Sequence, residues 1–422
     1  MKKIIYGGAI LGLVAWGCGD MISNPVSGEF GLRMDDSGAT SEGISKVVQA
    51  NNQFALDVYS ELKGEEGNLF LSPYSISTAL AMTYEGARGQ TAEEIARVFH
   101  FPTDDPERRA AFAAVHNQLN EAAADYTLRV ANALWAQEDY RFLEAYLNVL
   151  QSYYAAKATN VDFGGEPEKA RQTINAWVEE RTERKIRDLF PQGTINGDTR
   201  LVLTNAIYFK GQWITQFDKR QTKNEAFHVS PDRSVNVPMM RLTGEGVEFK
   251  YTQDEDVQVL EMPYKGAKLS MLVLLPRSGG LAAFENALTL EKLEGWRARL
   301  RKQRVDVFMP KFTFETKYFM KEVLQKMGMP TAFTGGADFS GMDGTRNLFI
   351  QHVIHQAFVD VNEEGTEAAA ATGVSIGRTS VPQVAVFRAD RPFLFAIQDT
   401  GRGNLLFLGR VVNPEAGSAT RS

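Results

Sequence analysis

Residues 201–213 read LVLTNAIYFKGQW. The stretch Leu201–Phe209 is apolar on both of its faces, which is typical of a central strand that is covered on both sides. Asn205 interrupts this stretch, and a buried amide costs about 1–3 kcal/mol unless it finds hydrogen-bond partners. His355 interrupts the apolar stretch Val353–Ala357 in the same way. The two strands therefore predict either one shared buried hydrogen-bond cluster, or separate partners for each side chain in the backbone or in water.

The elements around this strand change in character along the chain. Helical periodicity and capping signals come mostly before residue 200, and strand-like apolar stretches come mostly after it. Thr91–Glu94 has the spacing of a capping box and predicts the start of a helix. Residues 281–302 are expected to form one helix. Because residues 44–414 contain no repeats and no long linker, they predict one large α+β domain.

The first 17 residues have the features of an export signal. Lys2 and Lys3 precede the apolar run Ile4–Gly17, which is too short to cross a bilayer as a helix. Residues 15–18, Ala-Trp-Gly-Cys, resemble the cleavage box of bacterial lipoproteins, although the Ala and the Trp are unusual there. This resemblance favours a bacterial, exported protein. It is either lipidated at Cys18 and anchored facing the periplasm or the outside, or secreted to the extracellular space with Cys18 as an incidental thiol.

Two further segments flank the predicted domain. Residues 18–43 are rich in Gly, Ser, Asp and Asn and contain few apolar residues, so they predict a flexible tether. Residues 415–422 form a C-terminal tail. Apart from a lipid at Cys18, nothing in the chain predicts contact with a membrane.

The composition argues against several classes of function. The 46 basic and 52 acidic residues give a net charge of −6, without the basic excess of a nucleic-acid-binding protein. Cys18 is the only cysteine, so the chain has no intrachain disulfide and no paired-cysteine zinc motif. It also has no G-x-S-x-G motif and no phosphate-binding glycine loop. His352 and His355 fall on opposite faces of a strand. We therefore expect no enzyme, no metal site and no cofactor.

Five basic residues lie close together in the sequence. They form either a solvated helix face or a binding site for a polyanion, and the sequence leaves both interpretations open. The residues are Arg297, Arg299, Arg301, Lys302 and Arg304.

The stretch 363–380, EEGTEAAAATGVSIGRTS, is the most unusual of the chain. Read with a period of two, one set of residues from Thr366 to Ile376 is small or apolar, and the other begins with Glu367 and is otherwise small or polar. This alternation is typical of a half-buried strand. Three glycines and the lack of bulky side chains are equally typical of a loop. The segment is therefore interpreted as an element with two states; the alternative, an alanine-rich helix or linker, is weakened by the glycines.

In several blocks spread over residues 44–414 the chain resembles the serpins. The resemblance implies a fold of three β-sheets, eight or nine helices and an exposed, mobile reactive loop. It also implies a monomeric inhibitor of serine proteases rather than an enzyme. The blocks that carry it are NLFLSPYSIS at 68–77, ALAM at 79–82, GARGQT at 86–91, TNAIYFKGQW at 204–213, MPYKG at 262–266, LSM at 269–271, PKF at 310–312 and FLGRVVNP at 407–414.

The resemblance also implies roles for individual residues. Four of them match the family's buried cluster beneath the centre of the main sheet, where the sheet must part: Ser72, Ser75, Asn205 and His355. Trp213 matches the tryptophan at the end of that sheet where insertion begins. The residues that match the hinge of inhibitory members are Glu363, Glu364, Gly365, Thr366, Glu367, Ala368, Ala369, Ala370 and Ala371.

The position of the reactive bond stays open between two registers. The common family spacing implies Thr379–Ser380, with an elastase-like or subtilisin-like target. A loop one residue shorter implies Arg378–Thr379, with a trypsin-like target. Two other functions remain as alternatives: inhibition of cysteine proteases on the same fold, or a non-inhibitory carrier or scaffold.

Overall fold

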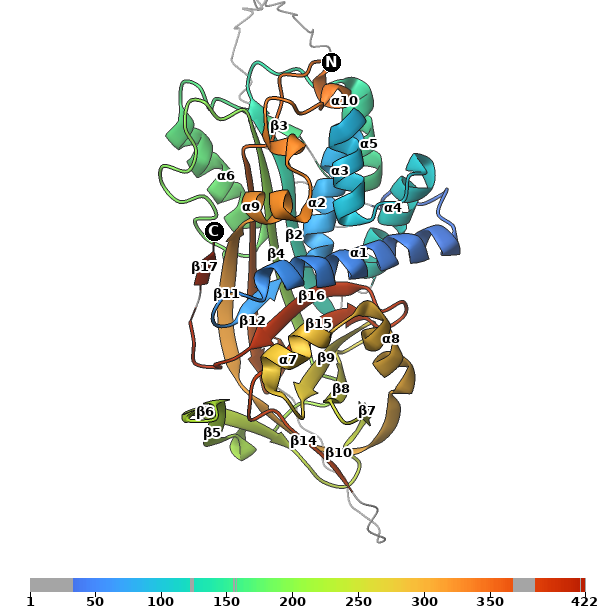
Figure 1. Ribbon diagram of the computed structural model, residues 1–422, viewed down its shortest axis with the longest axis vertical. Coiled ribbons are helices and arrows are strands. Elements are labelled where there is room, and N and C mark those ends of the chain that lie inside the picture. The colour runs from blue at the N-terminus through green and yellow to red at the C-terminus, as the bar shows by residue number, and fades with distance from the viewer. Residues whose placement is uncertain are drawn as a thin grey trace, which may run out of the picture. The chain divides into compact units, whose positions relative to one another are not determined.

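The computed structural model describes residues 33–121, 125–154, 156, 158–366, 384–417 and 419–421. Its main sheet has β4 and β12 at the centre, and both are buried along nearly their whole length. Strands of mixed direction flank them (Figure 1). The order across this sheet is β17 (Ala419–Arg421), β11 (Phe312–Phe319), β12 (His352–Asn362), β13 (Gly365–Thr366), β4 (Leu201–Gln212), β2 (Tyr126–Gln137) and β3 (Ala158–Val161).

The other strands form two further sheets that share β10. Residues 301–304 of β10 (Arg301–Pro310) pair with β7, and residues 307–310 pair with β6. The three expected sheets are thus confirmed, with one strand passing from the second to the third. The second sheet contains β1 (Leu69–Leu71), β16 (Leu405–Val411), β15 (Phe393–Asp399), β9 (Leu269–Pro276), β8 (Val257–Pro263) and β7 (Glu248–Gln253), and the third contains β6 (Arg233–Leu242), β5 (Lys223–Ser230) and β14 (Ala385–Arg388).

Ten α-helices lie in the described part of the chain, against the eight or nine expected, and α10 is a single turn of four residues. No helix among the described residues is long and apolar enough to span a bilayer. The helices are α1 (Ser41–Leu62), α2 (Pro73–Gly86), α3 (Gly89–Phe99), α4 (Asp105–Glu121), α5 (Glu144–Tyr154), α6 (Pro167–Arg181), α7 (Gly280–Ala287), α8 (Leu290–Arg299), α9 (Met320–Met327) and α10 (Ser340–Asp343), with 3-10 turns η1 (Lys219–Gln221) and η2 (Thr331–Phe333).

Two local predictions are wrong, and tertiary contacts explain the first. Helix α3 begins at Gly89 without a side-chain cap. Thr91 instead accepts a hydrogen bond from the backbone of Asp338, and the Glu94 carboxylate accepts two from Thr331. Residues 281–302 form two helices and the start of a strand, because Thr289 caps α8 by accepting from the backbone N–H of Lys292.

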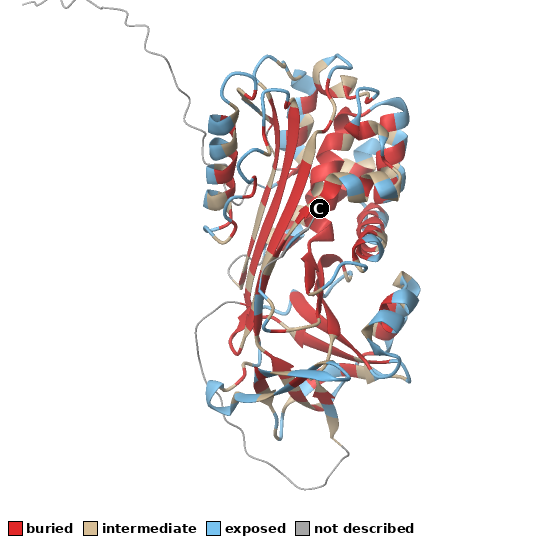
Figure 2. Ribbon diagram, turned by 60° about the vertical axis from the view of Figure 1, so that its left-hand side comes forward, coloured by how far each residue is buried: buried red, intermediate tan, exposed pale blue. Residues whose placement is uncertain are grey.

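The main sheet is buried between two layers (Figure 2). On one face, α6 and the turn that follows it form a separate apolar cluster with β2, β4 and β12, which includes Val202, Ala206 and Ile354. On the other face the sheet packs into the large core, through residues such as Leu203, Ile207 and Phe209. Because side chains alternate along β4, odd-numbered residues face the large core and even-numbered residues face α6.

Candidate functional site

The centre of the main sheet is partly open. Strands β4 and β12 pair in parallel from Val202 opposite His352 to Tyr208 opposite Phe358, and then they diverge. The two residues of β13 fill the space between the diverging ends and pair antiparallel with both strands. Thr366 lies opposite Gly211 on one side and Val361 on the other. The first residues of the expected hinge therefore already form the start of a new central strand.

Gly365 is the residue that lets the chain enter this space. Its φ angle is +153°, and an added Cβ would lie only 2.0 Å from the carbonyl oxygen of Gly211. A side chain here would push the two strands apart or strain the backbone. The glycine is therefore required by the close approach of the hinge to β4.

Thr366 contacts a group of aromatic side chains through Tyr264. Its hydroxyl lies 2.9 Å from the hydroxyl of Tyr264, and both side chains are buried. Tyr264 stacks on Trp213 at 4.6 Å with an interplanar angle of 13°, and it meets Phe209 edge-on at 5.0 Å. The indole Nε1 of Trp213 donates to the backbone oxygen of Asn362 at 3.0 Å. The space around Thr366 thus suits a small side chain with a hydroxyl group.

The two glutamates before Gly365 anchor the hinge by charge. The Glu363 carboxylate lies 2.9 Å from the Lys311 ammonium and accepts a hydrogen bond from the Thr222 hydroxyl at 2.7 Å. Glu364 pairs with the ammonium of Lys219. Burial opposes the ionisation of Glu363, but the hydrogen bonds from Lys311 and Thr222 outweigh it, so the pKa of Glu363 is lowered from its ordinary value. The hinge is therefore fixed up to Thr366.

A buried polar cluster lies further along the same two strands, where Asn205 is opposite His355. The backbone N–H of Ser72 donates to His355 Nε2 at 2.9 Å, so the ring hydrogen is on Nδ1 and donates to Asn205 Oδ1. Asn205 Nδ2 donates to the Ser75 hydroxyl at 2.6 Å. All four residues are fully buried. The structure therefore places them in one network, rather than giving Asn205 and His355 separate partners.

Known proteins are similar to this chain over most of its length. The family model for serpins (serine protease inhibitors) matches residues 49–414. This chain belongs to the serpin family. An uncharacterised serpin-like protein of Thermococcus kodakarensis is 44% identical over 381 residues, which cover 89% of this chain and 88% of the relative. The bovine leukocyte elastase inhibitor is 42% identical over 380 residues, which cover 88% of this chain and all of the inhibitor.

A solved structure supports the same assignment of the fold. Human thyroxine-binding globulin, complexed with thyroxine, superimposes with a TM-score of 0.80 at 32% sequence identity. The match covers 89% of this serpin and 100% of that chain. A protein named as an elastase inhibitor and one named for binding thyroxine are thus both similar to this chain.

Asn132 of β2 is a member of the buried cluster that the sequence analysis missed. It lies directly opposite Asn205 and accepts from the Asn205 amide and from the Ser75 hydroxyl. Its own amide donates to the backbone oxygen of Ser75 at 3.2 Å. The only signal in the sequence is one amide among the small and apolar residues 130–136, and a polar residue on a half-buried strand is ordinary. The cluster therefore joins β2, β4, β12 and α2.

The remaining predicted residues of the loop lie outside the described residues. These are the hinge residues from Glu367 to Ala371 and the alternative reactive bonds at Arg378, Thr379 and Ser380. Both registers of the reactive bond stay predictions.

The basic cluster does not form one helix face, because its residues belong to both α8 and β10. Arg299 lies 2.9 Å from the Asp254 carboxylate, and Lys302 lies 2.9 Å from the Glu248 carboxylate. The carboxylates of Asp254 and Glu248 therefore neutralise part of the positive charge that would bind a polyanion.

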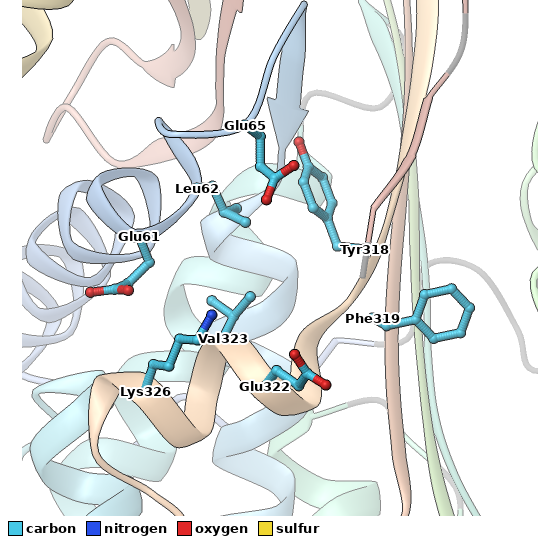
Figure 3. Close-up of a pocket in the computed structure, with 8 residues that line it drawn as sticks. All are labelled: Glu61, Leu62, Glu65, Tyr318, Phe319, Glu322, Val323 and Lys326. Atoms are coloured by element: carbon cyan, nitrogen blue, oxygen red, sulfur yellow. The ribbon is translucent and has the colours of Figure 1, made fainter.

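One pocket lies where α1, β11 and α9 meet (Figure 3). Its volume is about 40 Å³, which leaves room for water but not for a peptide or a cofactor. Tyr318 and Phe319 point to opposite sides of β11 in Figure 3, and Tyr318 stacks on His355 at 6.2 Å. No group of three or more His, Cys, Asp or Glu residues in the described ranges could hold a metal ion.

The buried histidine predicts a dependence of stability on pH. Burial lowers the pKa of His355 to about 3, whereas an unfolded chain has a histidine pKa near 6.5. Between these values the unfolded state binds a proton that the folded state does not. The free energy of unfolding therefore decreases as the pH falls from about 6.5 to about 3, with a limiting slope of about 1.4 kcal/mol per pH unit from this group.

Thermal unfolding of wild type and His355→Gln across this pH range measures the effect. The variant is expected to melt lower than wild type at neutral pH, because the cluster is incomplete, but with a shallower loss of stability in acid. Other titrating groups are common to both proteins. An equally steep acid dependence in the variant would contradict the assignment.

The hinge ion pair predicts an asymmetry between its two partners. The Glu363 side chain is 4% exposed and that of Lys311 is 38% exposed. Lys311→Met leaves a buried carboxylate without its cation, whereas Glu363→Gln leaves an ammonium that water can reach. We expect Lys311→Met to lower the melting temperature more than Glu363→Gln, and the double variant to be more stable than the sum of the two losses. Purely additive losses in the four-protein cycle would show that the pair is not coupled.

Proposed function

We propose that this serpin is a single-use inhibitor of serine proteases that traps its target by inserting the cut reactive loop into the main sheet. The observation that carries the proposal is the pairing of Gly365 and Thr366 with both β4 and β12. A strand that has begun in this position continues by parting the parallel pair below it. The buried cluster of Ser72, Asn205 and His355 lies on that line of parting.

The register of β13 defines where each later residue of the arm would lie. Because Thr366 is opposite Gly211 and the strands are antiparallel, residues 367–376 continue opposite residues 210–201. Ala368 and Ala370 then face Phe209 and Ile207 in the large core, and Val374 and Ile376 face Leu203 and Leu201. Thr372 comes opposite Asn205, so the one polar residue of this set meets the polar cluster.

The other face of the inserted arm would lie beneath α6. Glu367 comes opposite Lys210, which is a favourable cross-strand pair. The residues after it on this face are Ala369, Ala371, Gly373 and Ser375, all of which are small. They fit under a helix that already covers Val202 and Ala206. Both faces of the arm thus match the sheet that would receive them.

The covalent step follows from ordinary serine protease chemistry. The protease serine attacks the carbonyl carbon of Thr379, or of Arg378 in the other register, and an ester forms as the peptide bond breaks. The nitrogen of the next residue takes a proton and leaves with the C-terminal part of the loop. The arm is then free to insert, and it carries the attached protease with it before water hydrolyses the ester.

Insertion is favourable because two antiparallel ladders replace one parallel ladder. About ten additional backbone hydrogen bonds at roughly 1 kcal/mol net each give on the order of 10 kcal/mol. The uncut form is then kinetically trapped, because the parallel pairing of β4 and β12 must break first.

Family membership alone does not choose between trapping and carrying, since a leukocyte elastase inhibitor and a thyroxine-binding globulin are both similar to this chain. The composition of the arm favours trapping, because no bulky, proline or charged residue follows Glu367 before residue 378.

The proposal further places the protein outside the cytoplasm as a monomer, either anchored through a lipid on Cys18 or secreted. Incubation with papain-like enzymes tests the alternative that the target is a cysteine protease.

Cutting the loop tests the proposal directly. We expect the cut protein to melt about 10–20 °C higher than the uncut protein, because the arm becomes a central strand. Thermal unfolding before and after limited proteolysis, with mass spectrometry of the released peptide, measures the gain and identifies the reactive bond. A cut protein that melts no higher than the uncut one would remove the inhibitor function and leave the fold.

Thr366→Arg tests the start of insertion. The bulky charged side chain cannot occupy the space beside Tyr264. Insertion of the arm therefore becomes slower than hydrolysis of the ester. We expect at least a tenfold increase in the number of inhibitor molecules consumed per protease molecule, with cleaved inhibitor as the product. Thr366→Ser, which keeps a small hydroxyl side chain, is the matched control and traps like wild type. An SDS-stable complex of Thr366→Arg at wild-type stoichiometry would show that the arm does not insert here.

A further inference from the structure

Residues 33–40 lie within the segment that the sequence predicts as a tether, and the structure binds them to α4 and α5. They read RMDDSGAT, and we call them the strap. Met34 is 4% exposed, whereas Asp35, Ser37 and Gly38 are exposed. One buried methionine in a polar, exposed stretch indicates that the strap is attached to the body of the protein at that residue.

Asn117 of α4 recognises the backbone of Met34. Its Oδ1 accepts a hydrogen bond from the N–H of Met34 at 2.8 Å, and its Nδ2 donates to the carbonyl oxygen of Met34 at 2.9 Å. Nδ2 also donates to the Asp36 carboxylate at 3.0 Å. Asn117 is itself 6% exposed. Two opposed hydrogen bonds to one residue reproduce the pairing of antiparallel strands, so Asn117 fixes an extended peptide in one register.

The end of α5 adds a third contact to the backbone of the strap. The N–H of Asp35 donates to the carbonyl oxygen of Ser152 at 2.8 Å. Ser152 lies in the last turn of α5, where carbonyl groups have no partner within the helix. Three consecutive backbone groups of the strap, the N–H and C=O of Met34 and the N–H of Asp35, are therefore bound by α4 and α5 together.

The other end of the strap is attached separately. There the Thr40 hydroxyl donates to the Glu107 carboxylate at 2.9 Å, near the start of α4. Glu107 lies about 15 Å from Asn117 along the helix. Ser37 and Gly38, between these two contacts, are exposed. The contacts around the first residues of the strap are thus separate from the contact where the strap joins α1.

We propose that the surface of α4 and α5 around Asn117 is a peptide-binding site, which the chain's own strap occupies. Its ligand is an extended peptide with an unbranched apolar side chain at the position of Met34. Hydrogen bonds to the peptide backbone supply the affinity, and the buried side chain supplies the selectivity. The inference does not rest on the proposed function, because no part of the main sheet takes part in it.

The strap has an advantage over any free peptide, because it is joined to α1. A linked segment acts at an effective concentration in the millimolar range. A free peptide therefore binds measurably only when the strap has been weakened. Met34→Asp weakens the strap, because a carboxylate is costly to bury where the thioether lies. This substitution leaves Asn117 and the carbonyl of Ser152 in place to bind the free peptide.

The test uses the full chain as wild type, Met34→Asp, Asn117→Ala and Asn120→Ala. The last is the matched control, because Asn120 is an amide of the same helix that bonds to His116 and not to the strap. Each protein is mixed with a synthetic peptide of residues 33–40, or with the same peptide carrying Met34→Asp. Thermal unfolding measures stability, and hydrogen exchange with mass spectrometry measures the protection of residues 150–154.

We expect Met34→Asp and Asn117→Ala each to melt at least about 3 °C lower than wild type, and Asn120→Ala to lose less. The peptide of residues 33–40 restores at least half of the loss in the Met34→Asp protein and slows exchange at its residues 150–154. Wild type does not respond, because the strap fills the site, and Asn117→Ala does not respond, because the amide is absent. Asn117→Asp keeps an acceptor but loses the donor, and it serves in the same way if Asn117→Ala does not fold.

Three results would overturn the inference. In the first, the Met34→Asp protein is destabilised but the peptide of residues 33–40 changes neither its melting temperature nor its exchange at millimolar concentration. In the second, the peptide stabilises Asn117→Ala as strongly as it stabilises Met34→Asp. In the third, the peptide carrying Met34→Asp stabilises the Met34→Asp protein equally well. None of these results affects the proposed function, which the melting of the cut protein tests separately.

Discussion

The parallel pairing of β4 with β12 is the contact on which the rest of the molecule depends. It holds the main sheet closed from Val202 to Tyr208, and the insertion step of the proposed trapping reaction requires it to break. The strength of this strand pairing has two limits. A fully apolar centre would resist the separation of β4 from β12, and a buried polar centre without hydrogen bonds would not fold. The network of Ser72, Asn205 and His355 meets both demands, since all its groups are satisfied while the sheet is closed.

The interactions at the hinge and at β14 act on the two ends of the same loop. At one end, Lys311 and Lys219 hold Glu363 and Glu364, so that the chain enters the sheet in a fixed register. At the other end, Glu225 and Phe308 hold Arg388. The described segments on both sides of the loop are thus held by ion pairs to the body of the molecule.

The sequence predicted the centre of the fold well, because central strands carry a strong signal. Leu201–Phe209 is apolar on both faces. The isolated Asn205 and His355 left a shared cluster and separate partners both open, and the resemblance to the serpins favoured the cluster. Asn132 was missed because one amide on a half-buried strand is ordinary. The contact between Phe308 and Arg388 could not be predicted, because the two residues are far apart in the sequence and meet only through the strand register. The prediction of a capping box at Thr91 was wrong because Thr91 bonds to the backbone of Asp338 instead of capping the helix.

The register of the hinge on β4 also separates the part of the loop that would insert from the part that would contact a protease. Positions up to residue 376 would each acquire a fixed neighbour in the sheet, so their side chains answer to the interior of this molecule and not to any enzyme. In the proposed reaction, recognition of a particular protease would be left to the short remainder around residues 377–383. A change of target protease would therefore require substitutions only among residues 377–383, while the arm that inserts into the sheet stays the same. In that proposal a single segment would meet two separate sets of constraints.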